Sequence, residues 1–113
     1  MYSDLPCAEE ACWNRQVAPV AARVPVVTTE FAGITGPQAE PCAAAAAFDE
    51  RFMTWADAHG VSYGGFRWSA DFGHFPRPEC SYDLLADWSG VPRYGHGRAV
   101  HDHLARVAPR VAR

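Results

Sequence analysis

The chain has 113 residues and a formal net charge of −3; 49% of it is hydrophobic and 12% is Phe, Trp or Tyr. This composition can fill a core, and it excludes a disordered or collagen-like chain. Because the chain is nearly neutral, has no basic cluster and has no apolar stretch of the ~20 residues that span a bilayer, we expect neither nucleic acid nor a membrane as a partner.

The first part of the chain predicts a helix followed by a buried strand. Residues 9–18 are compatible with a helix, which Pro19 interrupts or restarts as a short turn. Residues 24–31 form a β-branched run without the alternation of a half-exposed strand. We therefore expect a strand that is covered on both faces in a parallel sheet.

A second helix is expected from Pro41 to His59. Gly60 stands just past its end, where glycine ends many helices. Large apolar residues recur along this helix at i, i+4 and i+7 and therefore share one face, which we expect to be buried. These residues are Phe48, Phe52 and Trp55.

The last part of the chain predicts one more strand and one more helix. The strand covers residues 61–68 and contains two glycines, which mark a bend or a close approach to the backbone. The helix covers residues 95–107. We expect its buried stripe to be Val100, Leu104 and Val107, and we expect His96, His101 and His103 to face solvent.

Helices and strands thus alternate, which indicates an α/β fold with parallel strands joined by right-handed crossovers. The two strands should lie side by side. Each of them, if buried, also needs a neighbour on its other edge, which two strands cannot supply. We therefore expect the sheet to extend beyond this chain.

One carboxylate stands where chemistry is expected. Glu30 lies at the carboxyl end of the apolar strand 24–31, and Trp68 ends the next strand at the same edge of the sheet. In α/β barrels, catalytic groups collect at this edge. A carboxylate beside a flat apolar ring suits the cleavage of a sugar, although a glutamate at a strand end often only caps a loop or forms an ion pair.

Three segments in a fixed order resemble a known family. Residues 25–31 read PVVTTEF, residues 52–57 read FMTWAD, and residues 60–63 read GVSY and lead to Trp68. With the closing segment 84–95, this order and spacing resemble the end of glycoside hydrolase family five, a family of cellulase-like enzymes. The resemblance runs from the sixth loop of the family's barrel to its eighth helix.

The resemblance implies that residues 1–113 are the carboxy-terminal part of a catalytic domain built as a (β/α)8 barrel, with strands seven and eight and their flanking helices. It implies a retaining endo-β-1,4-glycanase that needs no cofactor or metal and acts on a polysaccharide of the β-glucan or β-mannan type. Glu30 aligns with the nucleophile, and Trp68 aligns with the residue that stacks on the sugar. Tyr2 corresponds to a tyrosine that hydrogen-bonds the nucleophile.

The chain also departs from the family's pattern. Glu30-Phe31 is followed by Ala32, and the expected glycine comes one place later, at Gly33. The family's acid/base stands in an Asn-Glu pair, and this sequence contains none. A complete barrel takes ~250 residues. We therefore expect this chain alone to fold poorly and to be inactive, and the complete enzyme to be a secreted monomer.

Four cysteines suggest two disulfides and an oxidising compartment. If the barrel is present, Cys42 and Cys80 lie in loops that meet above its mouth, and we expect them to pair. Cys7 and Cys12 would then join within the loop after strand six. No secretory signal precedes them, and a missing amino-terminal region would reconcile that with export.

Two other classes of protein stay open. One is a small carbohydrate-binding module without activity, although such modules are mostly β-sandwiches and this sequence predicts helices. The other is a zinc protein that uses Cys7, Cys12, His59 or His74 as ligands, although no second Cys/His pair follows at ligand spacing. Four loop residues could line outer sugar subsites or only pack; these are Asp71, His74, Trp88 and Tyr94.

Overall fold

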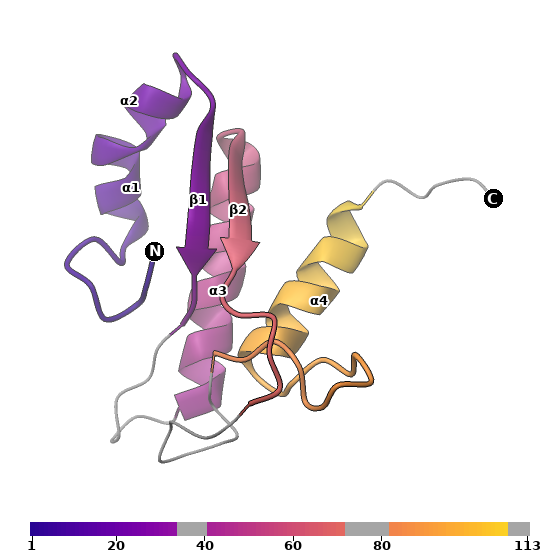
Figure 1. The fold of residues 1–113 in the computed structure, drawn as a ribbon. Coiled ribbons are helices and arrows are strands. Elements are labelled where there is room, and N and C mark those ends of the chain that lie inside the picture. Colours follow the sequence, from indigo (N-terminus) through magenta and orange to yellow (C-terminus); the bar gives the residue numbers. More distant parts are fainter. Residues whose placement is uncertain (34–40, 72–81, 109–113) are drawn as a thin grey trace.

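The computed structural model describes residues 1–33, 41–71 and 82–108. Within these residues the chain is a small α/β domain with four helices and a two-stranded parallel sheet (Figure 1). The elements in chain order are α1 (Glu10–Gln16), α2 (Ala18–Ala21), β1 (Val26–Phe31), α3 (Pro41–Ala58), β2 (Val61–Gly65) and α4 (His96–Val107). The predicted α/β alternation is confirmed.

The sheet contains the parallel pair that the sequence predicts. Val26 lies opposite Val61, and Thr28 lies opposite Tyr63. The other edge of β1 carries a short parallel bridge between Tyr2 and Ala32, whose N–H donates to the Met1 carbonyl at 3.1 Å. The amino-terminal residues therefore lie beside β1 in the same direction as β2.

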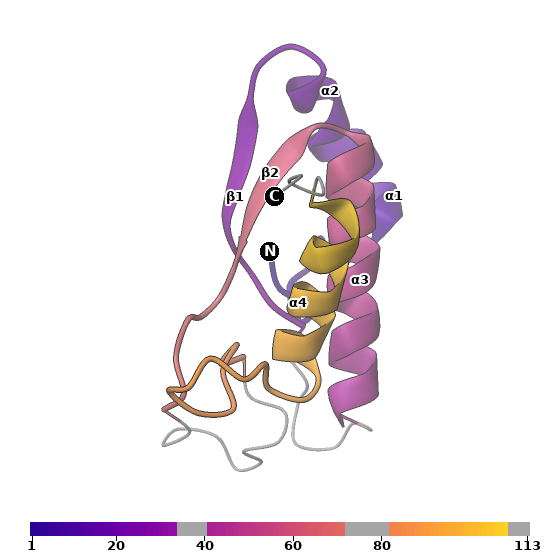
Figure 2. The same cartoon turned by 90° about the vertical axis from the view of Figure 1, so that its right-hand side faces the viewer.

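All four helices lie on the same side of the sheet (Figure 2). In the described part of the chain no helix covers the other face of the sheet, here called the open face, and Val27 on it is 61% exposed. The expectation that residues 24–31 are covered on both faces is therefore wrong for the described part of the chain.

The core is a cluster of aromatic rings between the sheet and the helices. Trp13 of α1 contacts three aromatic residues of α3, and Phe31 at the end of β1 packs against Phe52 with their ring centroids 5.1 Å apart. The predicted face of α3 is confirmed as buried; it consists of Phe48, Phe52 and Trp55. Gly60 adopts a φ of 66° and so ends α3 as expected.

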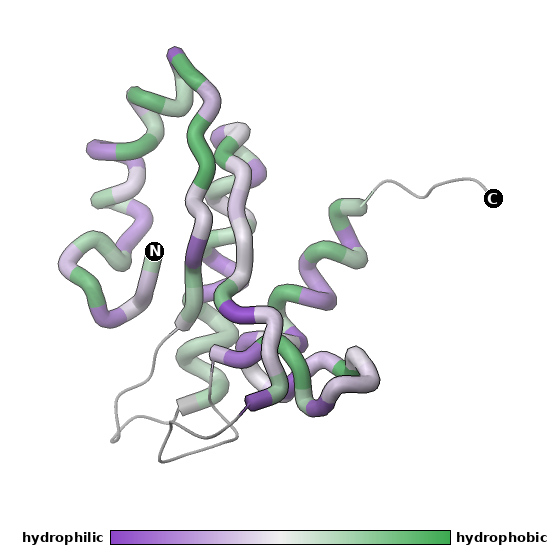
Figure 3. Tube along the Cα trace, in the orientation of Figure 1, coloured by the Kyte–Doolittle hydropathy of each residue, from purple (hydrophilic) through white to green (hydrophobic). Residues whose placement is uncertain are grey.

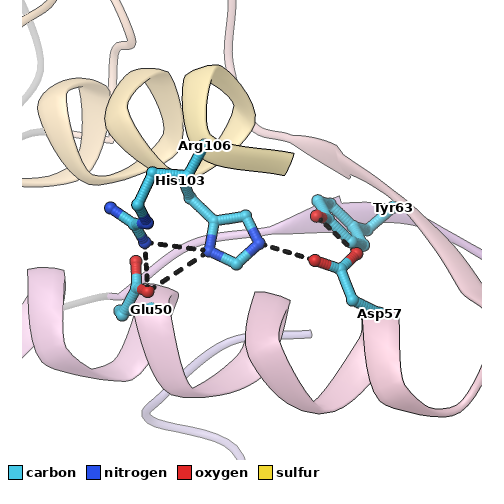
Figure 4. Close-up of polar contacts among 5 residues, drawn as sticks. All are labelled: Glu50, Asp57, Tyr63, His103 and Arg106. Carbon is cyan, nitrogen blue, oxygen red and sulfur yellow. Dashed lines mark hydrogen bonds and ion pairs between the residues drawn. The ribbon is translucent and has the colours of Figure 1, made fainter. Parts of the chain in front are cut away.

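The buried stripe of α4 differs from the predicted one. Val100 is buried, but Leu104 and Val107 are 45% and 49% exposed, and His96 and His103 are buried instead. The reason is electrostatic, because α4 packs on a part of α3 that carries carboxylates. His103 Nε2 lies 2.8 Å from Asp57 Oδ2 (Figure 4).

A polar cluster thus joins α3, α4 and β2 (Figure 4). His103 Nδ1 lies 3.3 Å from Glu50 Oε1, and Arg106 donates a hydrogen bond to the same carboxylate. The Tyr63 hydroxyl donates to Asp57 Oδ1 at 2.9 Å. Only His101 of the three histidines faces solvent as predicted.

Candidate functional site

Glu30 is exposed at an irregularity in β1. Thr28 pairs with Tyr63 and Phe31 pairs with Gly65, so three steps along β1 match two steps along β2. The extra residue lets Thr29 and Glu30 both be exposed while Phe31 is buried. Bulges of this kind redirect side chains and are common next to active sites. Along β1 the colour changes from hydrophobic to hydrophilic and becomes hydrophobic again at Phe31, the last residue of the strand (Figure 3).

Tyr2 contacts the Glu30 carboxylate. The Tyr2 hydroxyl donates a hydrogen bond to Glu30 Oε2 at 2.6 Å. Burial of the phenol, together with the hydrogen bond to Glu30 and the charge of Glu30, raises the pKa of Tyr2 to about 12. The phenol therefore keeps its proton at neutral pH and remains a donor to Glu30.

The aromatic ring of Phe66 packs against Tyr2. Its centroid lies 6.5 Å from that of Tyr2, in an edge-on arrangement. The Phe66 N–H donates to the Phe31 carbonyl at 3.0 Å, which places Phe66 beside the residue that follows Glu30. From the sequence we expected an aromatic ring for stacking on a sugar near Glu30, and we expected this ring to be Trp68.

Trp68 has a different place from the one predicted. β2 ends at Gly65, so Trp68 does not end a strand. It is 73% exposed and lines an apolar cavity of about 400 Å³ with residues that include Leu84, Val100 and Leu104. The described residues that line this cavity include neither Glu30 nor Tyr2. The structure therefore brings Tyr2 to Glu30 and Phe66 to Tyr2, while Trp68 lines this cavity.

Beneath this site lies a buried pair that sequence reasoning missed. Asp49 Oδ1 accepts the Gly33 N–H at 2.7 Å, and Oδ2 lies 2.7 Å from His96 Nδ1. A signal for Asp49 existed, because it stands three residues before Phe52 on the apolar stripe of α3. A carboxylate at a core position of a helix needs partners when it is buried.

The cysteines agree with the predicted pairing as far as they are described. Cys7 and Cys12 form a disulfide with their Cα atoms 5.5 Å apart. Cys42 is also disulfide-bonded, while Cys80, its expected partner, lies outside the described residues. Because Cys7 and Cys12 are bonded to each other, they cannot act as thiolate ligands of zinc.

The other residues that were considered as zinc ligands or as sugar subsites lie in different surroundings. Within the described ranges, no group of three or more His, Cys, Asp or Glu residues is placed to hold a metal ion. His59 stacks on Trp55, and His74 lies outside the described residues. Trp88 and Tyr94 are exposed, and the Asp71 carbonyl accepts a hydrogen bond from Arg67 at 3.0 Å.

Comparisons with known protein families, with curated proteins and with solved structures find no match for this chain. The helices in its described part are all too short or too polar to cross a membrane.

Proposed function

We propose that this chain is the carboxy-terminal part of a secreted, retaining glycosidase of the (β/α)8 barrel class and that Glu30 is its nucleophile. The hydrogen bond from Tyr2 to Glu30 carries this proposal. A tyrosine that binds the nucleophile is what the resemblance to glycoside hydrolase family five implies. Tyr2 and Glu30 belong to segments that are far apart in the sequence, so the contact between them forms only when the chain folds.

The arrangement of the sheet supports the barrel. Sequential parallel strands with every helix on the same face are typical of a barrel, in which the helices form an outer ring. An open doubly wound sheet would carry helices on both faces. Glu30 is exposed next to the buried Phe31, and it lies at the carboxyl end of its strand. Because neighbouring side chains of a strand point to opposite faces, we infer that Glu30 points to the face without helices, which in a barrel faces inward.

The chemistry follows from the position of the carboxylate. A Glu30 oxygen would bond to the anomeric carbon of the sugar while the glycosidic C–O bond breaks and its electron pair leaves with the departing oxygen. Water would then cleave the glycosyl ester and release Glu30. Tyr2 would orient the carboxylate, and the Phe66 ring would offer an apolar surface to the sugar.

The leaving group of a natural polysaccharide must also be protonated. Retaining enzymes use a second carboxyl about 5 Å from the nucleophile for this step. The only asparagine of this sequence, Asn14, precedes Arg15, so the Asn-Glu pair of the family is not in this sequence. We therefore propose that the acid/base lies outside these 113 residues and that the chain alone does not hydrolyse a β-glucan.

An activated sugar removes the need for the acid. A 2,4-dinitrophenyl 2-deoxy-2-fluoro-β-cellobioside has a leaving group that departs without protonation, and its fluorine slows hydrolysis of the glycosyl-enzyme. We expect the chain to release one equivalent of dinitrophenolate in a burst and the Glu30→Gln variant to release none. Equal release by both proteins would overturn the assignment of Glu30, and so would no release by either.

One observation favours a second function. Trp68 and Trp88 are each 73% exposed, and Tyr94 is also exposed, as is usual for rings that stack on sugars. A carbohydrate-binding module without activity would use such rings. Its affinity for cello-oligosaccharides would be the same in the wild type and in the Glu30→Gln variant, whereas replacing Trp68 or Trp88 by alanine would weaken binding.

A further inference from the structure

The Asp49 carboxylate is buried beneath the end of β1, where an apolar side chain could also fill the core. Asp49 and His96 both have essentially no exposed side chain. Burial raises the pKa of Asp49, although hydrogen bonds from His96 and Gly33 act in the opposite direction. Buried ion pairs often add no stability compared with apolar residues of similar volume. We therefore looked for a role of Asp49 and His96 other than packing in the contacts that they make.

The contacts of the pair converge on the three residues that follow Glu30. Asp49 accepts the Gly33 N–H at 2.7 Å. The His96 ring lies edge-on to Phe31, with their centroids 5.7 Å apart. Gly33 also lies so close to α3 that a Cβ atom there would stand 2.3 Å from the Ala45 carbonyl oxygen. The backbone is thus held on both sides of Ala32.

The bulge makes this anchoring important for Glu30. At a bulge the ladder between strands is locally interrupted, so neighbouring hydrogen bonds do not fix the extra residue. Glu30 lies within the irregular segment between Thr28 and Phe31. The Glu30 carbonyl also accepts a hydrogen bond from the Met1 ammonium. The position of Glu30 therefore depends on this bond and on the residues that follow it, which Asp49 and His96 hold from α3 and α4.

We propose that Asp49 and His96 are positioning residues for Glu30 and that they fix the backbone of residues 31–33 so that the Glu30 carboxylate meets the Tyr2 hydroxyl. That this positioning serves catalysis rests on the proposed function. The positioning of Glu30 against Tyr2 can be tested independently, because the contact between Tyr2 and Glu30 can be followed without a substrate.

The test compares two aspartates of α3. Asp49→Leu removes both polar contacts at similar volume, and Asp49→Asn keeps an acceptor for the Gly33 N–H. Asp57→Asn is the matched control, because Asp57 contacts His103 and Tyr63 and makes no bond to residues 31–33. Two NMR readouts are followed: the titration of the Tyr2 ring and the hydrogen exchange of the Gly33 amide.

We expect Asp49→Leu to lower the pKa of Tyr2 from about 12 and to speed exchange at Gly33 at least tenfold. Asp49→Asn should preserve the protection of Gly33, and Asp57→Asn should leave both readouts unchanged. If Asp49→Leu does not fold, His96→Phe keeps the ring beside Phe31 and removes only the bond to Asp49. It should lower the pKa of Tyr2 as well.

An unchanged Tyr2 titration in the folded variant that lacks the Asp49–His96 bond would overturn the positioning role. The glycosidase proposal would survive that result, since it depends on the reaction of Glu30 with an activated sugar. Conversely, a chain that never reacts with the sugar but shows the expected Tyr2 shifts would lose the proposed function and keep the positioning pair.

Discussion

The Tyr2 hydroxyl donates a 2.6 Å hydrogen bond to Glu30 Oε2, although the two residues are 28 positions apart in the sequence. The bond crosses from the amino-terminal bridge to the irregular end of β1. It gives an exposed carboxylate a hydrogen-bond partner from another segment of the chain.

The bond should be visible in the ionisation of Tyr2. Glu30→Gln removes a negative charge beside the phenol, so the pKa of Tyr2 should fall from about 12 toward its ordinary value of 10. It should not reach 10, because burial is the largest cause of the shift. NMR titration of the tyrosine rings measures this, and Tyr2→Phe identifies the signal. An unchanged Tyr2 pKa in Glu30→Gln would contradict the contact.

The aromatic core should dominate stability. Phe52 is fully buried and packs against Trp13, Phe31 and Tyr63. Replacing it by alanine should lower the free energy of unfolding by about 3–5 kcal/mol, as for other buried phenylalanines. Val27→Ala on the open face should change it by less than about 0.5 kcal/mol. Urea denaturation followed by circular dichroism compares the two, and similar losses would contradict the described packing.

The polar cluster between α3 and α4 predicts a dependence on pH. Burial acts to raise the pKa of Glu50, but hydrogen bonds from Arg106 and His103 and their charges lower it overall from its ordinary value of 4.5. A carboxyl whose pKa is lower in the folded state stabilises the fold above its unfolded pKa. This contribution is lost as the pH falls below 4.5 through the lower folded pKa.

Denaturation between about pH 6 and about pH 3 tests this cluster. The wild-type chain should lose more stability over that range than Glu50→Gln, whose side chain cannot titrate. Glu9→Gln is a suitable control, because Glu9 is exposed and only 4.0 Å from Arg51 at the limit of an ion pair. An equal acid sensitivity in the wild type and in Glu50→Gln would exclude Glu50 as the cause.

The disulfide between Cys7 and Cys12 should stabilise the amino-terminal segment. It closes a short loop, for which loss of chain entropy in the unfolded state corresponds to about 2 kcal/mol. The double variant Cys7→Ser, Cys12→Ser should lose about that amount in chemical denaturation under non-reducing conditions. The Trp13 indole donates to the Cys7 carbonyl at 2.7 Å, so its fluorescence follows the same region. A variant as stable as the wild type would contradict this role.

The sequence predicted what depends on periodicity and on strong local signals. The face of α3, the turn at Gly60 and the parallel pair of strands were predicted because apolar spacing and glycine placement are local features. Glu30 was singled out because a carboxylate that ends an apolar strand is unusual. These features do not depend on which residues meet across the fold.

The predictions that were wrong concern features set by contacts between residues that are distant in the sequence. The buried histidines of α4 were expected in solvent, because nothing in α4 shows that Asp49 and Asp57 face them from α3. Trp68 was expected to end a strand because the predicted strand covered residues 61–68, whereas β2 ends at Gly65. The bulge at which Thr29 and Glu30 are both exposed also leaves no local signal, since it appears only as a change of register between two strands.

The most direct measurement of the central claim is mass spectrometry of the chain after reaction with the 2-fluoro-β-cellobioside. We expect the intact mass to increase by one fluorocellobiosyl group, and we expect fragmentation of the proteolytic peptide to place that group on the Glu30 carboxyl. An unmodified chain, or a sugar attached to another residue and still present in Glu30→Gln, would contradict the account.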